Sequence, residues 1–220
     1  MAEKSDGLNY VMDMTLLDMD LSEEEGRAEL DSHADTCCGG SNTVLLEETG
    51  RNVTVRSFTP EHDSLDGIPI GTVAGSYDSR TGETLLLVWN ECMFFGDRLP
   101  TSLINPNQVR AAGHVVDECP KQFDKGSRHG IVTSCGLEIN LEMNGVISFI
   151  PMRKPTDKEI AECTRVEMTS AMRWDPHSQS FEKAEENALD KAGDIMCVES
   201  NNNSSNKIKL NSYPYITGGE

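Results

Sequence analysis

The chain has 220 residues, of which 37% are hydrophobic and 5% aromatic, and its formal net charge is -18. This length suffices for one globular domain with flanking segments. The acidic excess argues against a nucleic-acid-binding surface, because affinity for the phosphate backbone depends mainly on clustered Lys and Arg.

Other sequence features bear on the compartment. The first residues lack the basic start and continuous apolar core of a secretory signal, and no run reaches the roughly 18 apolar residues that span a bilayer. Seven cysteines without Cys-x-x-Cys spacing indicate free thiols rather than a disulfide framework or a zinc finger. We therefore expect a cytoplasmic protein with no membrane partner and no cofactor.

The N-terminal segment, residues 1–27, is rich in Asp and Glu. Its interspersed apolar residues have a spacing that is ambiguous between strand and helix. The composition predicts a flexible acidic leader, and an ordered edge strand is an equal alternative on this pattern.

Residues 28–152 are predicted to form an all-β, mainly antiparallel domain, because short apolar or alternating runs are separated by turn residues. These runs are residues 43–46, 52–55, 68–77, 84–89, 131–133, 137–141 and 146–150. Residues 68–77 and 84–89 should form a hairpin whose connection contains Gly82, and Asn144-Gly145 should form a tight turn.

One short helix is expected inside this domain. Asn105 can cap it, Pro106 suits its first turn, and Gly113 can take the left-handed closing position. Residues 153–220 are predicted to be a partly helical or disordered tail. A helix should start after Thr156, residues 180–192 have a helical composition, and residues 199–206 are polar and of low complexity.

The most informative stretch is Leu30-Asp31-Ser32-His33-Ala34-Asp35-Thr36-Cys37-Cys38-Gly39. It resembles the active-site loop of retroviral and retrotransposon aspartic proteases, whose signature reads Asp-Thr/Ser-Gly-Ala, often followed by a second Asp and a Thr. The resemblance implies that Asp31 is the catalytic aspartate and Ser32 the neighbouring hydroxyl. By the same match Ala34, Asp35 and Thr36 form the structural part of the loop.

Two downstream segments are also similar to this family. Residues 99–109 resemble the Asn-Leu-Leu-Ser-Val-x-Gln-Leu segment of copia-type retrotransposon proteases, and residues 141–149 resemble the closing hairpin of that domain. The resemblance covers residues 29–152 and implies a retropepsin-like β-barrel from a Pol polyprotein.

The implied activity is that of an aspartic endopeptidase that cleaves a polypeptide, with the polyprotein as substrate. Two neighbouring aspartates share a proton, so that the ionised one activates water while the protonated one donates to the substrate carbonyl. This chain has one such loop. A homodimer would therefore bring together Asp31 from each subunit, with Ser32 bracing the pair across the interface.

His33 stands where the family has glycine, and we expect it to modulate the site, because its Cβ and imidazole add bulk. One alternative is a non-catalytic remnant or interaction domain of the polyprotein, since a fold does not guarantee its site. A second alternative is a metal site. Asp31, His33, Asp35 and Cys37 recur at period two, and these ligands suit Mn, Fe or Zn.

Overall fold

The computed structural model describes residues 26–56 and 64–189. The expected acidic leader lies outside the described residues except for Gly26 and Arg27, and the polar stretch 199–206 lies outside them entirely. Among the described helices, none is long and apolar enough to cross a membrane.

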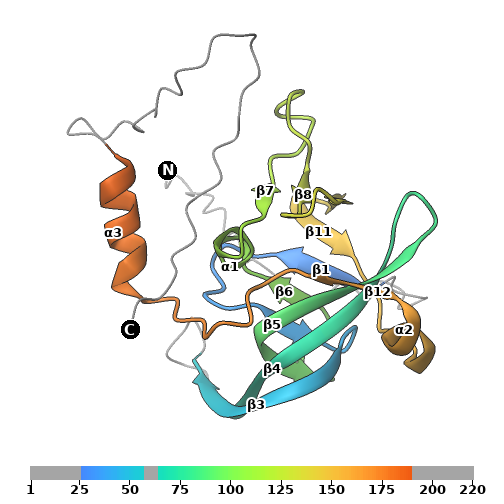
Figure 1. Ribbon diagram of the computed structural model, residues 1–220, viewed down its shortest axis with the longest axis vertical. Coiled ribbons are helices and arrows are strands. Elements are labelled where there is room, and N and C mark those ends of the chain that lie inside the picture. The colour runs from blue at the N-terminus through green and yellow to red at the C-terminus, as the bar shows by residue number, and fades with distance from the viewer. Residues whose placement is uncertain (1–25, 57–63, 190–220) are drawn as a thin grey trace, which may run out of the picture.

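The described chain is built mostly from strands (Figure 1). The strands are β1 (Arg27–Leu30), β2 (Cys38–Gly40), β3 (Val44–Val55), β4 (Leu65–Asp78), β5 (Thr84–Gly96), β6 (Ser102–Ile104), β7 (Val115–Asp117), β8 (Gly130–Val132), β9 (Glu138–Asn140), β10 (Glu142–Asn144), β11 (Ile147–Pro151) and β12 (Thr164–Glu167). The helices are α1 (Pro106–Ala111), α2 (Asp157–Glu162) and α3 (Gln179–Ala188).

Two sheets make up the fold. The larger has the order β10-β11-β1-β6-β2-β5-β4-β3, with β12 also paired to β5, and the smaller has the order β7-β8-β9. Seven of the ten strand pairings are antiparallel, as predicted; the parallel ones are β1 with β6, β2 with β5 and β12 with β5.

The expected closed barrel is not found in the described part of the chain. β10 and β3 are the two ends of the larger sheet and do not pair with each other. The first three strands after α1 explain this difference, because β7, β8 and β9 pair among themselves instead of extending the larger sheet. The prediction of an all-β domain is confirmed, but the prediction of a barrel is wrong.

The main hydrophobic core joins both sheets. Its buried members include Trp89 of β5, Ile104 of β6, Ile131 of β8 and Ile150 of β11. Leu86 and Val88 face a second, smaller cluster, because successive side chains of a strand point to opposite faces. Burial on both faces accounts for the nearly continuous apolar run of β5.

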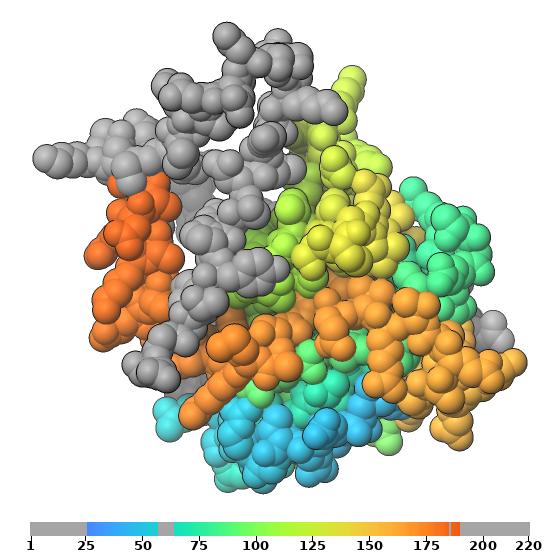
Figure 2. Space-filling view, in the orientation of Figure 1, coloured from blue at the N-terminus to red at the C-terminus, as the bar shows by residue number. Residues whose placement is uncertain are grey.

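The segment after Pro155 belongs to the folded body more than its sequence suggested. α2 and α3 provide the helical part, as predicted. Unexpectedly, β12 between them pairs in parallel with residues 85–88 of β5. Met168, just beyond β12, is fully buried in the main core. In Figure 2 these orange residues cross the face of the molecule between blue β3 and the yellow-green small sheet.

Local predictions met mixed outcomes. The 68–77 and 84–89 hairpin is present as β4 and β5. The two predicted strands 43–46 and 52–55 are instead one strand, β3, whose pairing with β4 is irregular around Gly50. The turn expected at Asn144-Gly145 lies one residue later, because Asn144 pairs with Ile147.

Candidate active site

The Asp31 loop, residues 31–37, begins where β1 ends. β1 is paired in parallel with β6, so that Leu30 lies beside Ile104, and the Asp31 backbone N–H donates to the Ile104 carbonyl at 2.9 Å. On its other side β1 pairs with β11. The start of the loop is therefore held by a strand in the middle of the larger sheet.

The end of the loop is held by α1 and β5. The Cys37 N–H donates to Gln108 Oε1 at 2.8 Å, and the Cys37 carbonyl accepts from the Met93 N–H at 2.9 Å. Both Cys37 and Gln108 are buried. Thus residues 31 and 37 are both fixed by contacts with residues that lie far away in the sequence.

Gln108 lies in helix α1, and the residues at the N-terminus of this helix favour its formation. The Asn105 side chain accepts from the N–H groups of Asn107 (2.7 Å) and Gln108 (3.3 Å), and Pro106 occupies the first turn. Gly113 has φ +89°, the left-handed conformation that favours glycine. The predicted cap, first turn and closing residue are all confirmed.

The C-terminal segment holds the middle of the loop. The Trp174 indole Nε1–H donates to the Asp35 carbonyl at 2.9 Å, and the Trp174 backbone N–H donates to Glu91 Oε2 at 3.0 Å. In Figure 1 the loop after β1, α1 and the orange coil between β12 and α3 lie on the same side of the sheets. Sequence reasoning missed Gln108, Glu91 and Trp174.

The Asp31 carboxylate is open to solvent on one side. Its side chain is 36% exposed, and Oδ1 accepts the His33 backbone N–H at 2.8 Å. His33 Nδ1 lies 3.9 Å from the same oxygen, and the His33 side chain is 93% exposed. The positive-φ non-glycine residues of the described chain are Glu91 and His129, so the backbone at position 33 does not require glycine.

The remaining residues of the motif divide by exposure. Ser32 and Asp35 are exposed, Ala34 is half-buried, and Thr36 is buried at the start of the strand region. The Asp35 carboxylate approaches His177 Nε2 at 4.0 Å, which leaves it solvated. Asp31, Ser32 and His33 are thus presented together on the outer surface of the loop.

The metal alternative is not supported. The described residues contain no group of three or more His, Cys, Asp and Glu side chains able to hold a metal ion. Cys37 is fully buried, and desolvation raises the pKa of its thiol to about 12, whereas a metal ligand must be a thiolate. The loop turns after Asp31 instead of remaining extended, so the alternating residues do not converge.

Buried thiols surround the exit of the loop. Burial, together with the nearby negative charges of Asp35 and Asp31, raises the pKa of Cys38 to about 12. Cys92 is fully buried too, and desolvation also raises its pKa. All three are free cysteines, as expected. They pack as small apolar side chains and are poor nucleophiles.

Comparison with protein-family models, with curated proteins and with solved structures finds no significant match to this chain.

Proposed function

We propose that this chain is a retropepsin-like aspartic endopeptidase of a retrotransposon polyprotein, or a descendant of one, that acts as a homodimer. The observation that carries the proposal is the contact between two motifs about 70 residues apart. The Asp31 loop and the segment that enters α1 each resemble the family separately, and they meet through the bonds of Asp31 to Ile104 and of Cys37 to Gln108. This contact supports the interpretation of the two matches as parts of one site.

The chemistry requires a second carboxyl group beside Asp31. With one carboxylate ionised and one protonated, the ionised group takes a proton from water as the water oxygen bonds to the substrate carbonyl carbon. The protonated group gives its proton to the carbonyl oxygen. The resulting diol then collapses: the carboxylate that gave up its proton takes one from a diol hydroxyl, the C–N bond breaks, and the other carboxyl group gives its proton to the leaving nitrogen.

The partner carboxyl group comes from Asp31 of a second copy. Ser32 and His33 are exposed and Asp31 is 36% exposed, so the surface that a second copy must approach is open. By the family resemblance, the Ser32 hydroxyl would brace the pair across the interface. Two like charges this close cannot both ionise at low cost, which provides the shared proton.

The hairpin of β3 and β4 is the better candidate for the flap that covers a substrate. Arg51 on β3 pairs with Glu91, and Glu91 also accepts from Trp174, which contacts the Asp31 loop. The turn of the other hairpin, at residues 79–83 between β4 and β5, lies in Figure 1 on the opposite side of the molecule from the loop after β1. Gly71 and Gly75 are in β4, which both hairpins share, so these glycines do not decide between the two hairpins.

The decisive experiment compares Asp31→Asn with wild type on a peptide library between acidic and neutral pH. Asp31→Asn should abolish cleavage without unfolding the protein, and the wild-type rate should be bell-shaped on the acidic side of neutral. Asp97→Asn is the control, because Asp97 is exposed and makes no side-chain hydrogen bond to the described residues. Equal cleavage by wild type and Asp31→Asn would refute the proposal.

Mixing tests the dimer. With a ninefold excess of Asp31→Asn, about nine-tenths of wild-type chains should be in mixed dimers, so activity per wild-type chain should fall about tenfold. Addition of the same excess of Asp97→Asn should not lower it. Activity that follows simple dilution would mean that a single chain carries the reaction.

His33 can be tested in the same assay. His33→Gly removes an exposed imidazole from the face that the second copy approaches, so cleavage should rise, by about tenfold if misplacement of the pair limits the rate. Loss of cleavage would instead assign His33 a role in the reaction. If wild type, Asp31→Asn and His33→Gly all fail to cleave the peptides, the non-catalytic remnant is the remaining explanation.

A further inference from the structure

β5 carries an irregularity next to the Asp31 loop. Gly71 pairs with Cys92 and Val73 pairs with Trp89, so β5 has one residue more than β4 between these pairs. Glu91, in this stretch, has φ +51°. Bulges of this kind redirect side chains and are common beside active sites.

The bulge also separates two strands that lie along the same edge of β5. β12 pairs with residues 85–88 and β2 with residues 93–96. Asn90 and Glu91 occupy the gap between them, and their carbonyl groups accept from Gln108 Nε2 at 3.4 and 3.2 Å. The same Gln108 holds the end of the Asp31 loop.

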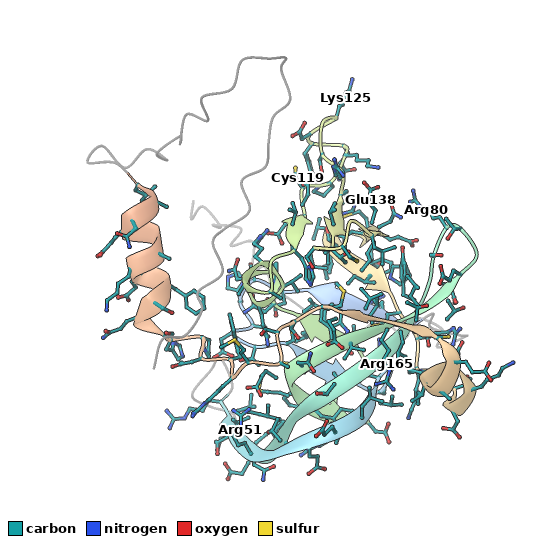
Figure 3. All side chains as sticks on the ribbon, in the orientation of Figure 1. Arg51, Arg80, Cys119, Lys125, Glu138 and Arg165 are labelled. Atoms are coloured by element: carbon teal, nitrogen blue, oxygen red, sulfur yellow. The ribbon has the colours of Figure 1, made fainter. Side chains whose placement is uncertain are left out.

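The C-terminal segment docks onto this bulge. Asn90 Nδ2 donates to the Thr169 carbonyl at 3.0 Å, and Thr169 Oγ1 donates back to the Asn90 carbonyl at 2.8 Å. Beyond Thr169, the Trp174 N–H reaches the Glu91 carboxylate, which also pairs with Arg51. Arg51 lies at the bend of β3 (Figure 3).

The last contact in this series is made by Trp174 with the Asp31 loop. The Trp174 Nε1–H donates to the Asp35 carbonyl in the middle of the loop, where His177 Nε2 of the same segment also lies 4.0 Å from the Asp35 carboxylate. The Trp174 ring also packs against Phe181 of α3, with the ring centroids 5.4 Å apart and the ring planes inclined at 55°. The Asp31 side chain remains 36% exposed, so the segment supports the loop without covering the carboxylate.

We propose that Trp174 is a positioning residue of the active site, which braces the Asp31 loop through the Asp35 carbonyl while anchored on Glu91. The working unit of the enzyme then extends at least through Trp174 and does not end at Met152, where the family resemblance ends. This inference rests on the proposed aspartic protease function. The brace itself is a property of the loop that can be measured without catalysis.

The test uses Trp174→Phe in the full chain, which keeps an aromatic ring and removes the indole N–H. Hydrogen exchange of the amides of residues 31–37 should become about 3- to 10-fold faster, as expected for loss of one net hydrogen bond. Exchange in β4 and β5 should stay unchanged. For cleavage, kcat should fall by a similar factor with KM unchanged, because the loop positions the reacting carboxylate rather than the substrate.

Met172→Ala is the matched control, because Met172 is in the same segment and 65% exposed. It should leave both exchange in residues 31–37 and kcat at wild-type values. Equal loop exchange in Trp174→Phe and wild type would overturn the proposal, as would acceleration spread evenly over the sheets. If wild type does not cleave, only the protease proposal fails. Faster exchange of residues 31–37 in Trp174→Phe would still show that Trp174 braces the loop.

Discussion

Two charge clusters on the β4–β5 hairpin contain similar groups in different surroundings. Near the Asp31 loop, Glu91 pairs with Arg51, and the Glu91 side chain is only 7% exposed. Near the hairpin turn, Arg153 pairs with Asp78 at 3.2 Å and with Glu159 at 2.6 Å, where the Arg153 and Asp78 side chains are 41% and 59% exposed.

The difference in burial changes what each cluster contributes. A buried carboxylate has lost its hydration, so each remaining partner is needed to offset that cost. Exposed ion pairs are screened by water and salt and contribute little. We therefore expect the cluster at the Asp31 loop to be sensitive to the loss of one partner, and the cluster at the hairpin turn to be tolerant.

The largest effect is expected from Arg51→Met. This change leaves the Glu91 carboxylate buried with the Trp174 N–H as its hydrogen-bond donor, and should lower the free energy of unfolding by about 3 kcal/mol. The double variant Arg51→Met/Glu91→Gln should recover much of this loss, because the uncompensated charge is removed. Urea unfolding measures both, and a loss below about 0.5 kcal/mol in the single variant would contradict the contrast.

A smaller effect is expected from Arg153→Met, of about 1 kcal/mol or less, because Arg153 and Asp78 are exposed, although the Glu159 side chain is 18% exposed. Hydrogen bonds from Arg153, followed by those from Thr156, lower the pKa of Glu159 to about 2. A lowered carboxyl pKa stabilises the fold above the ordinary value of about 4.5, and this contribution is lost as the pH falls from there toward 2.

Unfolding measured between pH 6 and pH 2.5 should therefore show a steeper loss of stability in wild type than in Arg153→Met. The control is Lys158→Met, since Lys158 lies 3.9 Å from Glu162 in an exposed pair. If stability falls with pH in parallel for wild type and Arg153→Met, the cluster makes no contribution to the pH dependence of stability.

The smallest effect concerns His114, which joins the C-terminal segment to the small sheet. His114 Nδ1 accepts the Ser134 N–H at 3.0 Å, and Nε2 lies 2.9 Å from the Glu167 carbonyl. Burial lowers the pKa of His114 below its ordinary 6.5. The unfolded chain therefore binds this proton more readily, and the contribution to stability is present above pH 6.5 and lost as the pH falls below it.

Protonation of His114 would remove the acceptor of the Ser134 N–H, a loss of about 1 kcal/mol or less. The free energy of unfolding should therefore fall less between pH 7 and pH 5.5 in His114→Gln than in wild type. His177→Gln is the control, because the His177 side chain is 85% exposed. An unchanged pH dependence in His114→Gln would assign this titration to other groups.

Local chemistry in the sequence was enough to predict several elements. Asn105, Pro106 and Gly113 predicted α1, and Thr156 predicted α2, whose capping box with Glu159 is present. These predictions succeed because caps and first turns depend on side chains only a few residues away. The alternating and apolar runs likewise predicted the β4–β5 hairpin.

The tertiary structure alone decided the arrangement around the Asp31 loop. Trp174 and Asp35 are 139 positions apart, and Cys37 and Gln108 are 71 apart. Such contacts leave no local pattern, because strand pairing and buried polar bonds are selected by packing of the whole fold. The same reason explains why the β5 bulge at Glu91, strand β12 and the separate small sheet were not predicted, although the Asp31 loop could be found by its sequence.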